Sequence, residues 1–213
     1  MARASKSKVS EEGGNEGAVR DRILDAAFSS FMENGYASTT TLAIATRARV
    51  SKRELYAIVG NKQEMLIACI ADRAKRLDIP VDLPAVRDRE TLEQVLVAFG
   101  TRLVQEVSDP TVVAVFRLAI AEAVRAPEVA RALDTIGRET SRTALRKIIA
   151  EAQTYGLLTG EPPGLAEQFL GLLWRDLMVS LLLGTTGRPT QDEIAARAQS
   201  AASAFLQLYS LPN

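Results

Sequence analysis

The chain has 213 residues, enough for one or two domains with a real core, and its 47% hydrophobic and 24% charged residues are typical of folded globular proteins. This composition excludes a wholly disordered chain and a fibrous repeat. The chain contains no histidine and one cysteine, Cys69, which excludes an intrachain disulfide, a thiolate metal cluster and the usual imidazole base. We therefore expect no catalytic residues, no metal and no cofactor.

The net charge is zero, with 26 basic and 26 acidic side chains, but the charge is unevenly distributed. Residues 1–77 carry 13 basic and 9 acidic side chains, whereas residues 78–213 carry 13 and 17. A basic front part and an acidic back part indicate two functions. The front part contains a short basic patch formed by Arg47, Arg49, Lys52 and Arg53. Such a patch is usually a solvated helix face unless a motif surrounds it.

Residues 1–17 are predicted to form a disordered tail, because they are rich in Gly, Ser, Glu and Lys and contain no aromatic residue. They have no apolar stretch of the kind found in signal peptides. Three basic residues leave open the alternative of an arm that reaches toward DNA: Arg3, Lys6 and Lys8.

Residues 18–77 are interpreted as a first domain of four helices. Apolar periodicity and capping residues place the first, third and fourth helices at residues 19–34, 52–59 and 63–77, with Ser51 as the cap of the third. The second helix carries Leu42 to Ala48, and each of the four hydroxyl residues at 38–41 is a possible cap for it. Only a tight turn of three residues separates the second helix from the third. Two short helices across a tight turn, supported by flanking helices, are typical of a helix-turn-helix.

A second domain is predicted over residues 78–213, beginning with a stretch that carries two prolines. Strand-like alternation is nowhere sustained, so the fold class is all-α. Prolines near most helix starts, where a missing N–H costs little, help to place five helices near residues 89–107, 110–125, 127–155, 163–183 and 190–209.

The predicted helix at 163–183 is apolar around most of its circumference, and the last helix is rich in alanine. Charged residues interrupt the apolar run, so it is not a membrane span. The pattern suits a four-helix interface between two copies, which we favour, although one large core within the chain explains the same pattern. The candidate interface residues are Phe169, Leu173, Leu177, Ala198, Ala202 and Phe205.

Several sequence blocks keep a characteristic spacing: Gly35-Tyr36, Thr39-Thr40-Thr41, Ile44-Ala45, Ala48, Val50-Ser51-Lys52-Arg53-Glu54-Leu55-Tyr56 and Asn61-Lys62-Gln63-Glu64-Met65-Leu66. Over about residues 19–70, the chain resembles the N-terminal DNA-binding domain of the tetracycline-repressor (TetR) family of bacterial transcription regulators. The later stretches at 115–123 and 166–178 resemble, more loosely, a C-terminal domain of the AefR-like subgroup.

The resemblance implies an all-helical homodimer with an N-terminal three-helix helix-turn-helix domain, followed by a helical bundle that binds an effector and forms the dimer. By matched position it implies phosphate contacts at the start of the second helix, further contacts to the DNA backbone, and base contacts by Arg53, with Glu54 as a second candidate. The implied DNA-contacting residues are Thr40, Thr41, Ser51, Lys52, Arg53, Glu54, Tyr56 and Lys62.

The chain also departs from the family pattern. Arg49 occupies a turn position where glycine is frequent, so either its backbone is unusual or the turn differs in detail. Ala57, Ile58 and Val59 stand where relatives often carry aromatic residues or histidine. The operator sequence therefore cannot be copied from relatives.

We expect a cytoplasmic bacterial repressor that binds a palindromic operator as a dimer and is released by a small-molecule effector. The alternative is a helical carrier of small molecules without a DNA function, and an enzyme is the weakest hypothesis. Glu122 and Arg175 could orient a polar effector group. The candidate effector-binding residues, which also suit an ordinary core, are Phe99, Leu103, Phe116, Arg117, Ile120, Trp174 and Met178.

Overall fold

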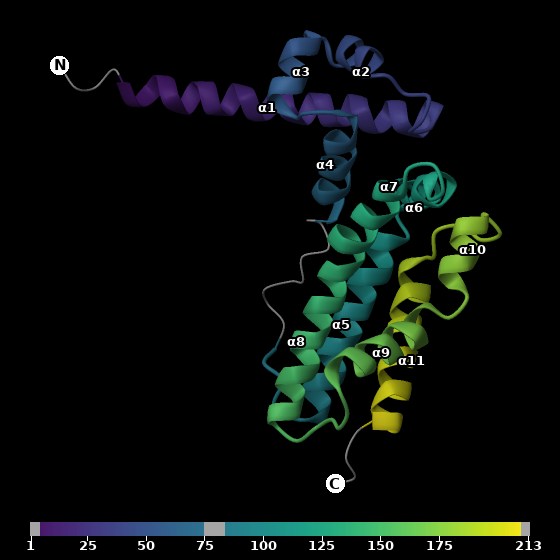
Figure 1. Ribbon diagram of the computed structural model, residues 1–213. Coiled ribbons are helices and arrows are strands. Elements are labelled where there is room, and N and C mark those ends of the chain that lie inside the picture. Colours follow the sequence, from purple (N-terminus) through teal and green to yellow (C-terminus); the bar gives the residue numbers. More distant parts are fainter. Residues whose placement is uncertain (1–4, 75–83, 210–213) are drawn as a thin grey trace. The chain divides into compact units, whose positions relative to one another are not determined.

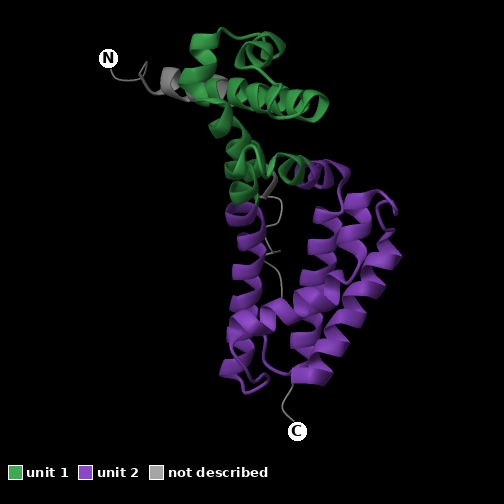
Figure 2. Ribbon diagram, turned by 45° about the vertical axis from the view of Figure 1, so that its right-hand side comes forward, with its two compact units in different colours: residues 1–72, 118–133 green, residues 73–117, 134–213 purple. Residues whose placement is uncertain are grey.

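The computed structural model describes residues 5–74 and 84–209, and within these ranges it contains helices and no β-strand. The chain divides into two compact units, one formed by residues 1–72 and 118–133 and the other by residues 73–117 and 134–213 (Figure 2). None of the described helices is both long enough and apolar enough to cross a membrane.

The first unit begins with four helices, α1 (Ser5–Asn34), α2 (Thr41–Ala48), α3 (Lys52–Ile58) and α4 (Lys62–Ala74) (Figure 1). Helix α1 packs against both α2 and α3. The apolar stripes predicted from the sequence meet in one core, whose fully buried side chains include Ile23, Phe31, Ile44, Leu55 and Met65. The short helices α2 and α3 are thus held by tertiary packing, which helices of this length need in water.

Helix α1 starts earlier than the sequence indicates. Residues 5–17, which we expected to be a tail, are helical, and residues 1–4 lie outside the described part of the chain. No proline interrupts this segment, and extending an existing helix costs little because nucleation is the expensive step.

The second unit holds α5 (Arg89–Val107), most of α6 (Pro110–Glu122), α8 (Glu139–Thr154), α9 (Pro162–Trp174), α10 (Leu177–Leu183) and α11 (Gln191–Tyr209). Between α6 and α8 the chain forms α7 (Pro127–Ala132) in the first unit, then a π-helical segment (Leu133–Arg138). Helix α9 lies against α8 and α11, and α11 lies against α5. Three aromatic rings join these helices: Phe99, Phe169 and Phe205, with neighbouring centroids 6.2 and 5.6 Å apart.

Two helices that we predicted as continuous are interrupted. The predicted helix at 127–155 contains the π-helical segment, and the one at 163–183 breaks between α9 and α10. At the second break Arg175 has φ 44° and ψ −122°, and Asp176 has φ −89° and ψ −12°. These are the dihedral angles of a type II′ turn. The turn redirects the chain so that Leu177 enters the same core as α9.

The six residues that we expected at a dimer interface lie instead in the core of their own chain, where each is at most 7% exposed. The small side chains of α11 allow close packing within the chain. A Cβ added to Gly100 of α5 would lie 3.3 Å from the Cβ of Ala198. The alternative of one large intrachain core therefore accounts for Phe169, Leu173, Leu177, Ala198, Ala202 and Phe205.

The predicted end of the fourth helix and most of the proline-containing stretch that begins at residue 78 fall in residues 75–83, outside the described residues.

Replacing Phe205 by Ala should lower the free energy of unfolding by about 3–5 kcal/mol, because the ring is fully buried between Phe169 and Tyr209. Chemical denaturation followed by circular dichroism measures this loss. The matched control is Leu208→Ala on the same helix, where the side chain is 65% exposed and the expected change is within about 0.5 kcal/mol. Equal effects of the two substitutions would contradict the position of the core.

Candidate nucleic-acid interface

The two short helices begin at hydroxyl caps. Thr40 is the N-cap of α2, and its Oγ1 accepts a hydrogen bond of 3.1 Å from the backbone N–H of Ala43. Ser51 is the N-cap of α3, and its Oγ accepts one of 3.1 Å from the backbone N–H of Glu54. Each cap satisfies one of the backbone donors at its helix start and leaves the remaining N–H groups there for an anion. Of the four hydroxyl residues at 38–41 that could cap α2, the structure uses Thr40, and the predicted cap of α3, Ser51, is confirmed.

The turn between α2 and α3 settles the question that Arg49 raised. Arg49 has φ 56° and ψ 46°, which is the left-handed conformation. The N–H of Val50 donates to the carbonyl of Ala45, and that of Arg49 donates to Thr46, as in a Schellman motif. Glycine is the usual residue at this position because it has no Cβ. The backbone is therefore unusual at Arg49, while the turn itself is of a common type.

Four exposed polar residues of α3 form the surface of the site: Lys52, Arg53, Glu54 and, beyond the buried Leu55, Tyr56. The Tyr56 Oη lies 3.3 Å from Thr41 Oγ1, and Lys52 Nζ lies 5.8 Å from the centroid of the Tyr56 ring. These contacts gather Thr41, Lys52 and Tyr56 into one cluster that spans α2 and α3.

Arg53 is exposed, and it makes no hydrogen bond or ion pair with any residue that the structure describes. The alternative that Arg53 pairs with a neighbouring acid is therefore not realised. All five N–H donors of its guanidinium are open to a ligand.

Lys62 is placed differently from the other predicted site residues. Its Nζ donates hydrogen bonds to the carbonyls of Tyr36, Ala37 and Thr39, at 2.9, 3.3 and 3.1 Å. It also lies 4.5 Å from the centroid of the Tyr36 ring. An ammonium group has three donors, and the loop between α1 and α2 uses all of them. Lys62 thus holds this loop, a role that its position in the sequence did not reveal.

Arg47, a member of the basic patch, is also engaged within the protein. Its guanidinium forms a bidentate ion pair with Glu33 of α1, with N–O distances of 2.6 and 2.7 Å. The hydrogen bonds from Arg47 lower the pKa of Glu33, so the carboxylate stays charged as the pH falls. This pair joins α1 to α2 and removes Arg47 from the cations that are open to a partner.

Sequence reasoning missed the part that Glu122 plays in this unit. Glu122 is buried at the end of α6, and its Oε1 accepts a hydrogen bond of 3.3 Å from the backbone N–H of Ala37. Burial raises the pKa of the neighbouring Tyr36, and the negative charges of Glu128 and Glu122 raise it further. The loop at residues 35–39 is therefore held by α4 through Lys62 and by α6 through Glu122.

The residues predicted to bind an effector are dispersed. Phe99 and Leu103 are buried in the core of the second unit, Phe116, Trp174 and Met178 pack half-buried against it, and Ile120 is 60% exposed. Arg117 donates hydrogen bonds to the carbonyls of Leu181 and Leu182. The structure does not gather these seven residues around one cavity that it describes.

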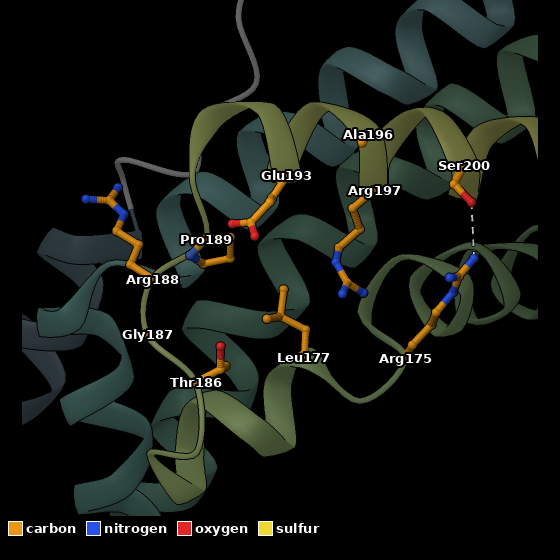
Figure 3. Close-up of a pocket in the computed structure, with 10 residues that line it drawn as sticks. All are labelled: Arg175, Leu177, Thr186, Gly187, Arg188, Pro189, Glu193, Ala196, Arg197 and Ser200. Carbon is orange, nitrogen blue, oxygen red and sulfur yellow. Dashed lines mark hydrogen bonds between the residues drawn. The ribbon is translucent and has the colours of Figure 1, made fainter.

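A pocket of about 500 Å³ lies between α11 and the segment that runs from Arg175 to Pro189 (Figure 3). None of the seven predicted effector residues lines it, whereas Arg175, which we considered as a polar partner of an effector, does. The pocket is lined by Arg175, Leu177, Thr186, Gly187, Arg188, Pro189, Glu193, Ala196, Arg197 and Ser200.

The chain is similar to known regulators in both of its parts. Residues 94–211 match the family described as the C-terminal domain of AefR-like transcriptional repressors, and residues 23–69 match the tetR family of bacterial regulatory proteins. The chain is 37% identical over 71 residues to the HTH-type transcriptional repressor SCO4008 of Streptomyces coelicolor. This match covers 33% of the chain and 36% of that repressor.

Two solved structures share the whole architecture. The flavonoid-responsive regulator FrrA is 27% identical with a TM-score of 0.78, and the similarity covers 92% of this chain and all of FrrA. A TetR transcriptional regulator from Agrobacterium tumefaciens is 29% identical with a TM-score of 0.74, covering 90% of this chain and 94% of that protein. The chain belongs to the TetR family of transcriptional repressors and carries the AefR-like C-terminal domain.

Proposed function

We propose that this repressor binds a palindromic operator as a dimer and that a small-molecule effector releases it. The observation that carries the DNA-binding part is Arg53, an exposed and unpaired guanidinium on α3, the second helix of the helix-turn-helix. Such a helix enters the major groove, where arginine reads guanine through two hydrogen bonds. Two copies of α3, one from each protomer, would lie about 34–36 Å apart to reach successive major grooves.

The residues around Arg53 would fix its position on the duplex. Thr41, Lys52 and Tyr56 form one exposed cluster that suits phosphate oxygens, and the capped starts of α2 and α3 add backbone N–H groups. Thr40 and Ser51 act mainly as helix caps, and Glu54 is exposed beside Arg53. Lys62 supports the site from within rather than by touching DNA.

The outer face of α9 is our candidate for the dimer interface. Gly164 and Gly171 are exposed there, and a Cβ added at either position would meet no atom within 4 Å. Glycines on an exposed helix face allow a second helix to approach closely. The neighbouring Gln168 adds a polar group that can pair across a two-fold axis.

Release by an effector requires that the effector bind one conformation of the dimer better than another. A flavonoid-responsive structural neighbour supports a small-molecule effector for this chain. As a regulator of transcription, the protein would act in the bacterial cytoplasm.

Replacing Arg53 by Ala should relax the choice of base at one position in each half-site and weaken operator binding by about 1–3 kcal/mol per contact. Selection of bound duplexes from a random pool, with wild type and variant side by side, measures both effects. Because Arg53 is exposed and makes no hydrogen bond or ion pair with a described residue, the melting temperature should change little. An unchanged sequence preference would remove Arg53 from the reading of bases. The absence of any salt-dependent DNA binding by the wild type would favour the carrier hypothesis instead.

Lys62→Met and Lys52→Met separate structural support from phosphate contact. Lys62→Met leaves three carbonyls without their donor and should cost about 1–3 kcal/mol of stability, while the dependence of the remaining DNA affinity on salt stays unchanged. Lys52→Met should leave stability within about 0.5 kcal/mol and reduce the slope of log affinity against log salt by about 1. The reverse pattern would assign the phosphate contact to Lys62.

Gly171→Arg tests the dimer surface without weakening the fold. Arginine is a better helix former than glycine by about 0.5–1 kcal/mol, and the position has open space for its side chain. The variant should therefore remain folded but run as a monomer in sedimentation velocity, and it should lose operator affinity. Gly171→Ala, which adds only a methyl group, is the control and should remain dimeric. A dimeric Gly171→Arg variant would place the interface elsewhere.

A further inference from the structure

We propose that the pocket between α10 and α11 binds a small organic monoanion, with its carboxylate at Arg175 and Arg197 and its apolar body against Leu177 and Pro189. At about 500 Å³, the pocket has the size of a small-molecule site. Its lining combines a few charged groups with apolar walls, as ligand sites commonly do.

Two guanidinium groups at this pocket have no carboxylate partner among the described residues. Arg197 uses Nη1 to donate to the carbonyls of Leu173 and Trp174, both at 3.2 Å, and Arg175 uses Nη2 to donate to Ser200 Oγ at 3.1 Å. Their remaining N–H groups have no partner in the described structure. Arginine matches the geometry of a carboxylate through paired donors.

The other charged groups of the pocket narrow the ligand class. Arg188 forms an ion pair with Asp109 at 3.6 Å and points away from the centre of the pocket (Figure 3). Glu193 accepts hydrogen bonds from the backbone N–H and hydroxyl of Thr190, which lower its pKa and keep it charged. A fixed negative charge beside two unpaired positive ones favours a monoanion over a multiply charged phosphate.

The backbone of Arg175 also indicates a role for its side chain. It occupies the first central position of the type II′ turn, where glycine is strongly preferred. A non-glycine residue is strained in such a conformation. Glycine would adopt this turn without the strain. Binding of the ligand carboxylate by the guanidinium gives arginine a function at this position that glycine could not supply.

Titration calorimetry on the full-length protein without DNA tests the site with benzoate, its uncharged isostere benzamide, and inorganic phosphate. Benzoate should bind more tightly than both of the other probes. Arg175→Gly should weaken benzoate binding about 10- to 100-fold, the effect of losing a charge-assisted hydrogen bond, while the melting temperature stays level or rises because the turn relaxes.

Arg197→Gln should weaken benzoate binding similarly, and the matched Arg188→Gln should leave it within about twofold of wild type. No binding of benzoate, equal binding of benzamide, or wild-type affinity in both Arg175→Gly and Arg197→Gln would overturn the proposal. The assignment of this anion as the effector rests on the proposed function. It is supported if benzoate lowers operator affinity in wild type but not in Arg175→Gly, and it fails if benzoate binds without that effect.

Discussion

The DNA-binding unit depends on one set of partly buried hydrogen bonds, which the ammonium of Lys62 donates to three carbonyls of a single loop. The loop at residues 35–39 links α1 to α2, and the Lys62 ammonium donates to its carbonyls at Tyr36, Ala37 and Thr39. Because the next residue along the chain, Thr40, caps α2, the position of this loop sets where α2 begins. The position of α2 in turn places α3 through the Schellman turn at Arg49. A single cation on α4 therefore orders the surface that we propose for DNA.

The same loop is also where α6 reaches the DNA-binding unit. Glu122 accepts from Ala37, and the end of α6 and α7 belong to the same compact unit as α1–α3. The rest of α6 belongs to the second unit, where Arg117 binds the carbonyl end of α10. One continuous helix thus carries contacts to both units.

Two arginines occupy backbone conformations that usually require glycine, and the two have different surroundings. At Arg49 the left-handed residue completes a hydrogen-bonded helix end, so the cost is partly offset by the carbonyls that it satisfies. At Arg175 the turn breaks a helix that the sequence indicates as continuous. That break brings Leu177 and Leu181 into the core and turns Arg175 toward Ser200. The pocket that we propose as an anion site exists because of this break.

The sequence by itself determined the elements that local chemistry controls. The cap at Ser51 and the apolar stripes of α1 and α2 were predictable, because capping and helical periodicity act within a few residues. The exposure of Arg53 also followed from the pattern of α3. Two short helices across a tight turn indicated the helix-turn-helix, and the family resemblance added the DNA-binding function.

The tertiary structure decided which partner each side chain meets. An apolar residue such as Phe205 looks the same in sequence whether its own chain or a second copy buries it, and only the packing of α11 on α5 and α9 distinguished the two. Likewise, the family resemblance implied that Lys62 contacts the DNA backbone, and only the position of the loop carbonyls showed that its ammonium already has three acceptors. No glycine or proline marks the break at Arg175 in the sequence. The break is stabilised by the burial of Leu177 and Leu181 against distant segments, which the local sequence does not show. Helix propensity and capping depend on neighbouring residues, whereas side-chain burial and hydrogen-bond partners depend on segments far apart in the chain.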